Sequence, residues 1–367
     1  MLNWKDTTHP LAGGAEFYTK QVCERLALRG HEVEWFTAAV EGQSDDEVVN
    51  GVRIIRSGGR LGVYREAKRF LRVHHGRFDV IIDQVNTIPF NARSVSKETP
   101  VVGLFHQLAR EVWFAETPLP VALVGRYVLE PFWLRRYRSM PVVTVSDSSA
   151  ASLTQAGVGP VVNLGQGGEL EELTAAAAGV MKTSHPSFVF CGRLGRSKRP
   201  KKAIEAFRLY VRTHLDAELH IIGDGPLMGE LVEMVKGDRE LQDRVTLHGH
   251  VSFEKRCELM AQAWALLVPS VREGWGLVVS EAAACGTRSI GYDIDGLRDS
   301  VPVCGGVLVE PTLDAMAAAM ADDAERLCAL GVPAATGTIS WDELADRWER
   351  FLRAQTRSVE ALHPAGA

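Results

Sequence analysis

Two glutamates in the segment Arg272–Thr287 (REGWGLVVSEAAACGT) stand at a spacing that suits a ligand rich in hydroxyl groups. If the whole segment were helical, Glu273 and Glu281 would lie about 12 Å apart along the helix axis. The two carboxyls of a glycosidase stand about 5 to 9.5 Å apart, so this pair is poorly spaced for hydrolysis. Two carboxylates spread along one ligand can each accept hydrogen bonds from its hydroxyls. Between them, Gly274 and Gly276 leave backbone N–H groups accessible at a helix start.

A basic cluster, Cys191–Pro200 (CGRLGRSKRP), follows an apolar run. Ligands of open α/β sheets bind beyond the carboxyl ends of the strands, and arginine and lysine hold phosphates by charge-assisted hydrogen bonds. Arg193 and Lys198 could therefore hold a diphosphate. A run of basic residues is more often a solvated face, an explanation that fits Lys201 and Lys202 better than it fits Arg193.

Glycine turns occur at two further places. In Pro10–Glu16 (PLAGGAE), Gly13 and Gly14 permit close backbone approach, and the helix that follows offers unpaired N–H groups to an anion. An ordinary tight turn explains this segment equally well. Gly223–Gly229 (GDGPLMG) differs in its glycine spacing from a dinucleotide fingerprint, and we interpret it as a turn.

The elements that position these segments alternate along the chain. Short β-branched runs are separated by helical segments, a pattern typical of parallel sheets covered by helices on both faces. A Gly-, Glu- and Ala-rich stretch at residues 164–186 divides two similar series and is the expected hinge region. The expected organisation is an amino-terminal domain at 1–165, a hinge at 166–187, a second domain at 188–340 and a helix at 341–367 that returns to the first domain.

The expected strands fall into two series of five. Met1–Trp4 has the character of the end of a further strand whose beginning is missing or very short, so we expect the protein to start a few residues upstream. The strands are predicted at 31–38, 52–56, 80–84, 101–106 and 141–146, and then at 188–194, 218–224, 244–249, 265–270 and 287–292.

The composition excludes several classes of protein. The chain has 367 residues, 46% of them hydrophobic, and a net charge of −5, which argues against a nucleic-acid-binding protein and against a disordered one. The six cysteines are scattered without a CxxC pair, which suits a reducing cytoplasm better than a zinc site or a disulfide framework. No apolar run approaches the roughly 20 residues that a membrane span requires, and no signal peptide opens the sequence.

Taken in order, these motifs resemble those of the retaining glycosyltransferases of family 4 over essentially the full length. The E-x7-E pattern of that family appears as Glu273 and Glu281, and its basic motif as Gly192-Arg193-Leu194 with Lys198. Its GxGP turn appears at 223–226, and its glycine loop at 13–16, followed by RGHEV at 29–33. The resemblance implies the GT-B fold, in which two doubly wound Rossmann-like domains face each other across a cleft.

The resemblance also implies a role for each motif. A nucleotide sugar would be held mostly by the second domain, and a small-molecule, lipid or polysaccharide acceptor mostly by the first. Glu273 would hold hydroxyls of the donor sugar, Glu281 the ribose, and Arg193 the diphosphate. The implied catalytic residues are His106, Arg193, Lys198 and Glu273. The implied donor-binding residues are Gly13, Gly14, Glu16, Gly223, Gly225, Gly274, Trp275, Gly276, Leu277 and Glu281.

The expected reaction uses no cofactor and no metal. We identify no Asp-x-Asp pair at a strand end poised to hold a cation, and Arg193 and Lys198 supply positive charge instead. The rival interpretations are a GT-B epimerase or phosphorylase, and a donor-binding partner subunit without turnover. A lone histidine at a strand end such as His106 is otherwise more often a packed core residue.

Three segments leave local questions open. Most family members have Lys-Gly where this chain has Lys198-Arg199-Pro200, so the turn at the phosphate lysine could differ. Residues 162–168 (VNLGQGG) replace the Asn-Gly-Val-Asp usual at the domain junction, so hinge contacts cannot be transferred. The basic and aromatic segment 124–138 is interpreted as an ordinary amphipathic helix, with a weak peripheral membrane contact or recognition of a lipid or aromatic acceptor as alternatives. The sugar, the base, the acceptor and the oligomeric state remain open.

Overall fold

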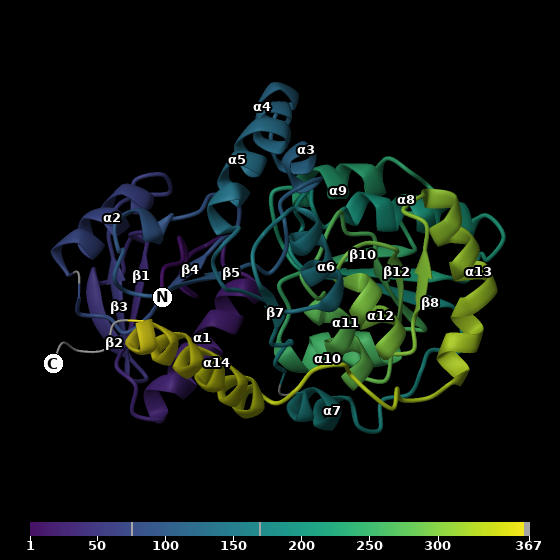
Figure 1. The fold of residues 1–367 in the computed structure, drawn as a ribbon. Coiled ribbons are helices and arrows are strands. Elements are labelled where there is room, and N and C mark those ends of the chain that lie inside the picture. The colour runs from purple at the N-terminus through teal and green to yellow at the C-terminus, as the bar shows by residue number, and fades with distance from the viewer. Residues whose placement is uncertain (75, 169, 363–367) are drawn as a thin grey trace, which may run out of the picture. The chain divides into compact units, whose positions relative to one another are not determined.

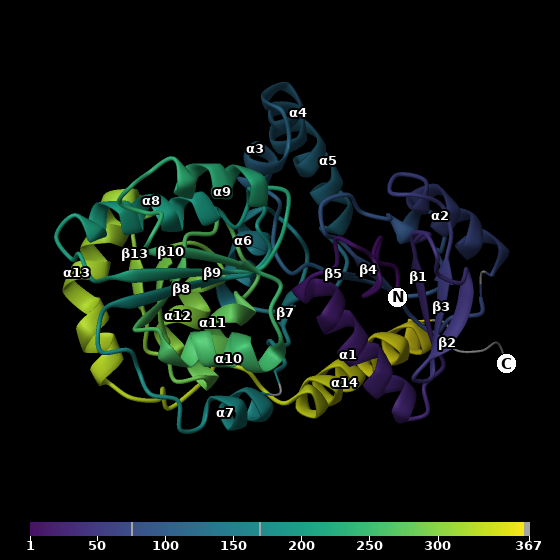
Figure 2. The same cartoon turned by 180° about the vertical axis from the view of Figure 1, so that it is seen from behind.

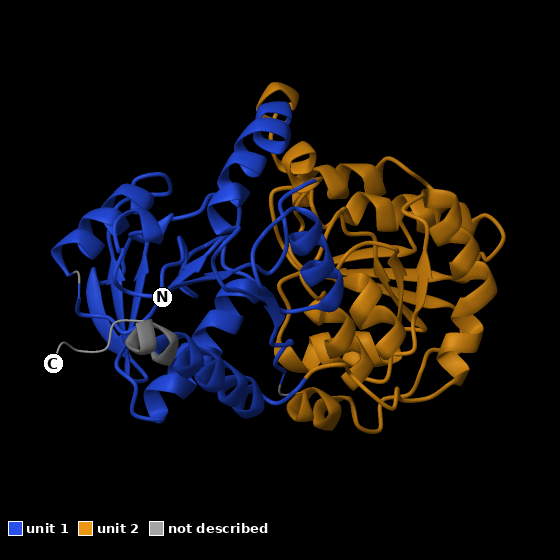
Figure 3. Cartoon of the chain, in the orientation of Figure 1, with its two compact units in different colours: residues 1–110, 123–168, 339–367 blue, residues 111–122, 169–338 orange. Residues whose placement is uncertain are grey.

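The chain forms two compact units (Figure 3). Our computed structural model describes residues 1–362 except residues 75 and 169, with side chains as far as Thr356. Unit 1 comprises Met1–Arg110, Leu123–Gly168 and the carboxyl-terminal segment from Ile339, and unit 2 comprises Glu111–Ala122 and Glu169–Thr338. Residues 363–367 of the helix expected at 341–367 lie outside the described residues.

Unit 1 contains two short groups of strands joined by Leu2 (Figure 1). One group has the order β1-β3-β2 and the other the order β4-β5-β6-β7, and Leu2 bridges to Phe36 in the first and to Asp83 in the second. All pairings are parallel except that of β2 with β3. The strands are β1 (Val33–Thr37), β2 (Asp46–Val49), β3 (Val52–Arg56), β4 (Ile81–Gln84), β5 (Val101–Leu104), β6 (Val142–Thr144) and β7 (Val161–Asn163).

Helices cover both faces of the unit 1 strands. Leu2 belongs to the larger core, which α2 and α6 close, whereas Met1 packs against the smaller core beside Cys23 of α1. The last helix, α14, lies against α1, where the Trp348 indole N–H donates to the buried Tyr18 hydroxyl at 2.9 Å. The helices are α1 (Gly14–Leu28), α2 (Val63–Val73), α5 (Glu130–Leu134), α6 (Asp147–Gln155) and α14 (Trp341–Leu362), with short η turns at Ala92–Ser94, Gly125–Leu129 and Arg135–Tyr137. Helix α4 (Leu119–Val124) crosses the division between the units, and its first four residues belong to unit 2.

Unit 2 is a six-stranded parallel sheet in the order β10-β9-β8-β11-β12-β13. Helices α8, α9 and α13 pack on one face, and α7, α10, α11 and α12 on the other (Figures 1 and 2). The strands are β8 (Ser187–Cys191), β9 (Glu218–Ile222), β10 (Val245–Gly249), β11 (Ala265–Val268), β12 (Arg288–Tyr292) and β13 (Val307–Val309). The helices are α3 (Val112–Glu116), α7 (Glu171–Ala177), α8 (Pro200–Val211), α9 (Met228–Lys236), α10 (Phe253–Gln262), α11 (Leu277–Ala284), α12 (Leu297–Val303) and α13 (Leu313–Ala329).

The structure differs from the expected boundaries in a few places. Strands β2, β7 and β13 were not predicted, because each has only three or four residues and lies at the edge of its sheet. Most of the expected hinge belongs to unit 2, since α7 buries Leu173 there. Residues 111–122 also belong to unit 2, where Glu111 pairs with Arg272 and Glu116 accepts from the Ser197 amide. Within the described part of the chain, no helix is both long and apolar enough to cross a membrane.

Candidate active site

The sheet of unit 2 reverses its direction of growth between β8 and β11. From β8 the chain adds β9 and β10 on one side, and it then returns to add β11, β12 and β13 on the other. Ligands of open α/β sheets bind at this kind of switch point, beyond the carboxyl ends of the strands. The segments that follow β8 and β11 carry the basic cluster and the glutamate motif, so the topology brings the two predicted motifs together.

Lys198 and Glu273 meet at this switch point. The Lys198 Nζ lies 2.5 Å from the Glu273 Oε1, and the Val271 amide donates to the Ser197 carbonyl at 2.8 Å, which ties the two segments together. The Glu273 side chain is 10% exposed and that of Lys198 is 38% exposed. A carboxylate and an ammonium group therefore stand side by side beyond the carboxyl ends of β8 and β11.

Arg193 and the two glycines of the GxGP turn lie close to this pair in the fold, but they play different parts. Arg193 is exposed. Gly223 and Gly225 pack against the backbone of the segment after β8: a Cβ on Gly223 would stand 2.1 Å from the Gly192 carbonyl oxygen, and a Cβ on Gly225 2.7 Å from the Leu194 carbonyl oxygen. Because the Leu194 amide donates to the Asp224 carbonyl at 2.9 Å, the turn fixes the backbone that carries Arg193.

The segment Lys198-Arg199-Pro200, which departs from the family pattern, forms the start of helix α8. Arg199 adopts a left-handed backbone conformation, with φ 53° and ψ 48°, at the start of α8. This region favours glycine, the residue that most family members have there. Pro200 then occupies the first turn of the helix, where a missing N–H costs nothing. The arginine thus keeps a turn that glycine would make with less strain.

The glutamate motif begins as a loop and ends as a helix. Helix α11 starts at Leu277, after Gly276 in a left-handed conformation with φ 86°. A Cβ on Gly276 would stand 2.7 Å from Leu297, so glycine is required by the packing as well as by the backbone. The Trp275 indole N–H donates to the Ser280 hydroxyl at 3.0 Å, which turns this ring toward the protein and leaves its backbone and that of Gly274 as candidate ligand contacts.

Glu281 lies on α11 and faces a different cation from Glu273. Its Oε2 is 3.4 Å from Nη1 of Arg256, a residue of α10, and the Glu281 side chain is mostly buried. Burial disfavours the charge on Arg256, but the Glu281 carboxylate and three nearby cysteines together outweigh this effect, so the pKa of Arg256 is raised. Arg256 was not singled out from the sequence, because its 25-residue separation from Glu281 gives no local signal.

A further acidic pair follows β12 and was overlooked in the sequence. Asp293 and Asp295 form an Asp-x-Asp pattern directly after β12. Both carboxylates are paired with arginines: Asp293 and Asp295 with Arg298, and Asp295 also with Arg272, the neighbour of Glu273. Among the described residues, no group of three or more His, Cys, Asp or Glu side chains could hold a metal ion.

The glycine loop of unit 1 is built on a buried carboxylate. Gly13 and Gly14 are exposed at the start of α1, and no protein atom lies within 4 Å of a Cβ placed on Gly14. Glu16 is buried, and its Oε2 accepts from the Gly13 amide at 2.8 Å and lies 3.2 Å from the Lys5 Nζ. In this arrangement Glu16 supports the loop by binding the Gly13 amide, and Gly14 is exposed at the first turn of α1.

His106 follows β5 in unit 1 and is partly buried. Its ring meets the ring of Tyr18 edge-on at 5.0 Å, and its Nε2 lies 3.4 Å from the Gln84 Nε2. With Gln84 placed so, the amide donates to Nε2 and the imidazole proton resides on Nδ1. Burial lowers the pKa of His106 to about 4, so the ring is neutral near pH 7.

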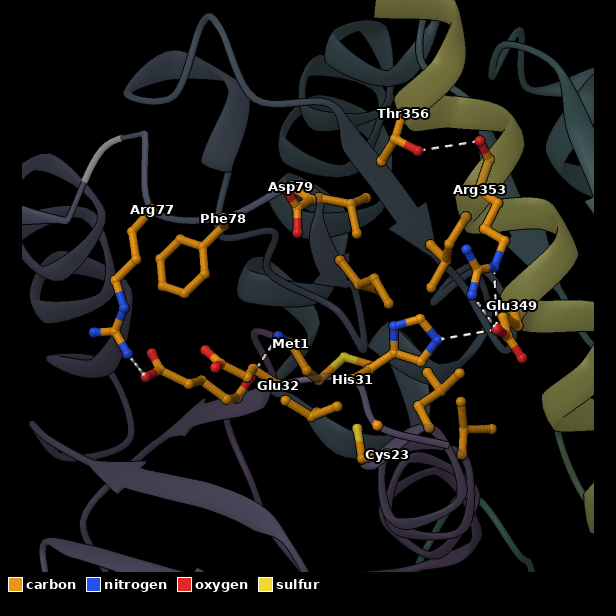
Figure 4. A pocket seen from close by; sticks show the side chains of 18 residues that line it. Met1, Cys23, His31, Glu32, Arg77, Phe78, Asp79, Glu349, Arg353 and Thr356 are labelled. Atoms are coloured by element: carbon orange, nitrogen blue, oxygen red, sulfur yellow. Dashed lines mark hydrogen bonds and ion pairs between the residues drawn. The ribbon is translucent and has the colours of Figure 1, made fainter. Parts of the chain in front are cut away.

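A cavity of about 540 Å³ lies at the amino-terminal ends of β1 and β4 in unit 1 (Figure 4). It is lined by residues that precede β1 and β4, such as Glu32 and Asp79, and by Glu349 and Arg353 of α14. None of the predicted site residues lines it. This cavity is therefore separate from the predicted site of unit 1, where His106 lies beyond the carboxyl end of β5.

Several known proteins are similar to this chain in sequence. Residues 185–328 match the family described as "Glycosyl transferases group 1" and residues 12–163 match "Glycosyltransferase Family 4". A D-inositol 3-phosphate glycosyltransferase of Xylanimonas cellulosilytica is 27% identical over 91% of this chain and 90% of its own length. An alpha-D-kanosaminyltransferase of Streptomyces kanamyceticus is 29% identical over 39% of this chain and 36% of its own length.

Solved structures agree in fold. A sucrose-phosphate synthase of Thermosynechococcus elongatus superposes with a TM-score of 0.70 at 22% identity, covering 99% of this chain and 96% of that one. WaaG, a glycosyltransferase involved in lipopolysaccharide biosynthesis, superposes with a TM-score of 0.64 at 16% identity, covering 100% of this chain and 99% of that one. The chain thus belongs to the group 1 glycosyltransferases, with the GT-B fold, and transfers a sugar from a nucleotide sugar to an acceptor.

Proposed function

We propose that this transfer retains the anomeric configuration of the sugar and needs no metal ion, with unit 2 holding the nucleotide-diphosphate sugar. The observation that supports this most directly is the meeting of Lys198 and Glu273 at the switch point of the unit 2 sheet. A cation suited to a phosphate and a carboxylate suited to sugar hydroxyls stand side by side there, as the two ends of a sugar-phosphate bond require.

In this proposal each polar group of unit 2 has one task. Arg193 and Lys198 hold the diphosphate and stabilise the negative charge that develops on the departing phosphate oxygen. Glu273 accepts hydrogen bonds from the donor sugar, and Glu281, held by Arg256, accepts them from the ribose. The acceptor hydroxyl attacks from the face that the phosphate leaves, so no enzyme nucleophile is needed, and catalysis consists of positioning and charge stabilisation.

Unit 1 would contribute the glycine loop, with the amide of Gly14 as the donor since Glu16 already binds the amide of Gly13, and the imidazole of His106. The amides at a helix start suit a phosphate oxygen. A neutral imidazole with its proton on Nδ1 can donate one hydrogen bond to a sugar hydroxyl without adding a positive charge beside the anomeric centre, where positive charge develops.

Metal independence is proposed because arginine and lysine supply the positive charge, and because Asp293 and Asp295 are already paired with arginines. Transfer should proceed at an unchanged rate in excess chelator. A chelator-treated enzyme that is inactive until manganese is added would overturn the proposal.

One assay tests the rest of the proposal. Nucleotide release from UDP- and GDP-sugars is measured with and without an acceptor extract, and the anomeric configuration of the product is read from its NMR couplings. Release that requires acceptor, with retained configuration, is the expected result. Donor isomerisation without acceptor would indicate an epimerase, and binding without release would indicate a non-catalytic subunit.

We also propose a cytoplasmic enzyme that touches an anionic membrane surface through residues 123–138. The sequence alone favoured an ordinary amphipathic helix, but Tyr127, Val128 and Phe132 are exposed, so the apolar residues of this segment are not all turned inward. Three basic residues of the same segment, Arg135, Arg136 and Arg138, are also exposed. The one acidic residue of the segment, Glu130, is buried, so the exposed surface of this segment is positive although the whole chain has a net charge of −5. Apolar and arginine side chains together suit anionic headgroups.

Vesicle flotation tests this contact. The protein should float with vesicles that contain phosphatidylglycerol but not with pure phosphatidylcholine, and the double change Tyr127→Ser and Val128→Ser should abolish flotation. Leu215→Ser, at an equally exposed site in unit 2, is the matched control. If the double variant floats with phosphatidylglycerol vesicles as well as the wild type and the Leu215→Ser control do, the proposed membrane contact is wrong. The contact is also wrong if the wild type floats with neither kind of vesicle.

A further inference from the structure

The imidazole of His106 is held on several sides within unit 1. The Ser149 hydroxyl donates to the His106 carbonyl at 3.1 Å, and the Tyr18 ring meets the imidazole edge-on at 5.0 Å. Tyr18 is itself buried and accepts from the Trp348 indole at 2.9 Å. The remaining contact is made by the Gln84 amide, whose Nε2 lies 3.4 Å from the His106 Nε2. These neighbours restrain the ring, and Gln84 is the one that contacts a ring nitrogen.

The Gln84 side chain is anchored in turn by Thr19 of α1. Both residues are fully buried, and the Thr19 Oγ1 lies 2.6 Å from the Gln84 Oε1. That length is normal for an O–H···O bond and short for an N–H···O bond, so the hydroxyl faces the amide oxygen. The hydroxyl also lies 2.9 Å from the Ala15 carbonyl, so its proton has two acceptors, of which the amide oxygen is the nearer. Thr19 thus fixes which end of the Gln84 amide faces His106.

This order of donors and acceptors decides the tautomer of His106. The amide nitrogen can only donate, so the His106 Nε2 must accept, and the imidazole proton resides on Nδ1. Because burial lowers the pKa of His106 to about 4, the ring keeps only this proton near pH 7. Among the residues that the structure describes, none forms a hydrogen bond with Nδ1, so its N–H is available to a ligand.

We propose that Gln84 is a positioning residue for sugar transfer: oriented by Thr19, it holds the proton of His106 on Nδ1 and makes the imidazole a fixed hydrogen-bond donor. This rests on the proposed function, in which His106 faces the transferred sugar. It adds that His106 is not a general base, because the lone pair that would accept a proton is bound by the Gln84 amide. The oxygen that meets Nδ1 must then accept a hydrogen bond, as a sugar hydroxyl can.

The same contacts connect His106 to the helix that follows the glycine loop. Thr19 lies on α1, which begins at Gly14, and Glu16 of this helix accepts from the Asn86 side-chain amide at 3.3 Å, just beyond β4. Helix α1 therefore binds side chains at two places around the end of β4. A change at Thr19 can reach His106 through Gln84 without altering the loop itself.

Gln84→Glu tests the proposal with little change of shape. A carboxylate has no proton to donate, so it would accept from Nε2–H and leave Nδ1 without its proton. Proton–nitrogen correlation NMR of protein with isotope-labelled histidine reads the tautomer, and His106→Gln identifies the signals of His106. The spectra are recorded at about pH 8.5, because a carboxylate beside the ring raises its pKa and the imidazole must remain neutral.

We expect the proton on Nδ1 in the wild type and on Nε2 in Gln84→Glu. The kcat of Gln84→Glu should fall by about tenfold or more, while its affinity for nucleoside diphosphate is kept. Gln43→Glu, the same change at an exposed site of unit 1, should alter neither the tautomer nor kcat.

Thr19→Val is the second variant, because it removes the hydroxyl that orients Gln84 and leaves Gln84 itself in place. It should populate both tautomers of His106 and lower kcat by a smaller factor than Gln84→Glu does. Thr19→Ser keeps a hydroxyl and should restore the single Nδ1 tautomer and the rate.

Three results would overturn the proposal. The first is a wild-type proton on Nε2, which would place the Gln84 oxygen against the ring. The second is an altered tautomer in Gln84→Glu with unchanged transfer, and the third is a single Nδ1 tautomer in Thr19→Val. The NMR reading needs no turnover, so these results differ from a failure of the proposed function, which would show as a wild type that releases no nucleotide in the presence of acceptor.

Discussion

Lys198 and Glu273 form an ion pair across the switch point of the unit 2 sheet, with Nζ 2.5 Å from Oε1, although 75 positions separate them in the sequence. Without donor, each of these groups is the other's partner. A diphosphate sugar would have to take over both, the phosphate binding the ammonium and the sugar hydroxyls the carboxylate. Under the proposed function, the pair would hold both side chains near their working positions until the donor arrives.

The first prediction concerns this competition. Glu273→Gln frees Lys198 from its carboxylate, so nucleoside diphosphate should bind at least as tightly as to the wild type, whereas Lys198→Ala should weaken it by roughly tenfold or more, the loss of a charged hydrogen bond. Calorimetric titration with UDP and GDP measures both. A double-mutant cycle on unfolding in urea should give a coupling of about 0.2–1 kcal/mol, because Lys198 is partly exposed. Equal loss of diphosphate affinity in both variants would contradict the assignment.

The second prediction separates the two glutamates. In the proposed arrangement Glu281 meets the ribose, which is the same in ground and transition states, so Glu281→Ala should raise the donor KM by roughly 10- to 150-fold with kcat largely kept. Glu273 is proposed to meet the sugar as it gains positive character, so Glu273→Ala should lower kcat at saturating donor. Steady-state kinetics measure both, and Glu254→Ala, at an exposed carboxylate on α10, is the control. Variants that lose folding stability alike but keep wild-type kinetics would show that both carboxylates are structural.

The third prediction distinguishes a glycine proposed to lie beside the donor from a glycine that packs tightly against the protein backbone. Gly14→Ala meets no protein atom within 4 Å, so its unfolding free energy should match or slightly exceed that of the wild type, while donor affinity falls by about tenfold. Gly223→Ala drives a Cβ onto the Gly192 carbonyl and should prevent stable folding of unit 2. Gly229→Ala, also without neighbours, should change neither quantity. Circular dichroism and nucleotide titration provide the measurements; full donor affinity in Gly14→Ala would remove the loop from the site.

The fourth prediction concerns the left-handed residue before α8. A non-glycine residue in this conformation costs about 1–2 kcal/mol, and glycine costs about 0.5–1 kcal/mol of backbone entropy. Arg199→Gly should therefore raise the free energy of unfolding by about 0.5–1 kcal/mol in urea titrations. Arg196→Gly, three positions earlier on the surface, should give no gain. A loss of stability in Arg199→Gly would mean that the arginine side chain outweighs its backbone strain.

The fifth prediction follows from the pKa of His106, which burial lowers to about 4, whereas a histidine of the unfolded chain titrates at about 6.5. Between these values the unfolded chain binds a proton that the folded protein does not, so His106 makes stability fall as the pH drops from 6.5 to 4. Relative to His106→Gln, the wild type should lose about 2 kcal/mol over this range. Urea unfolding at several pH values measures the difference, with the exposed His250→Gln as control. If the difference in unfolding free energy between the wild type and His106→Gln does not change with pH, the pKa of His106 is not lowered by folding.

The sequence predicted ten of the strands and the two α/β series, because buried parallel strands are continuous β-branched runs that local composition reveals. It missed β2, β7 and β13, since edge strands of three or four residues carry little periodicity. It also missed Arg256 as a neighbour of Glu281, and it overlooked the Asp293 and Asp295 pattern that the arginines neutralise.

By itself the sequence determined which residues could do chemistry: glutamates eight apart, a basic cluster and glycines at strand ends, because residue type and local spacing are properties of the chain. Only the tertiary structure decided what each group faces. Lys198 pairs with Glu273 and Glu281 with Arg256 because strands distant in the chain become neighbours in the sheet. Gly223 and Gly14 look alike in sequence, yet one approaches backbone and the other approaches open space, a difference that packing alone creates.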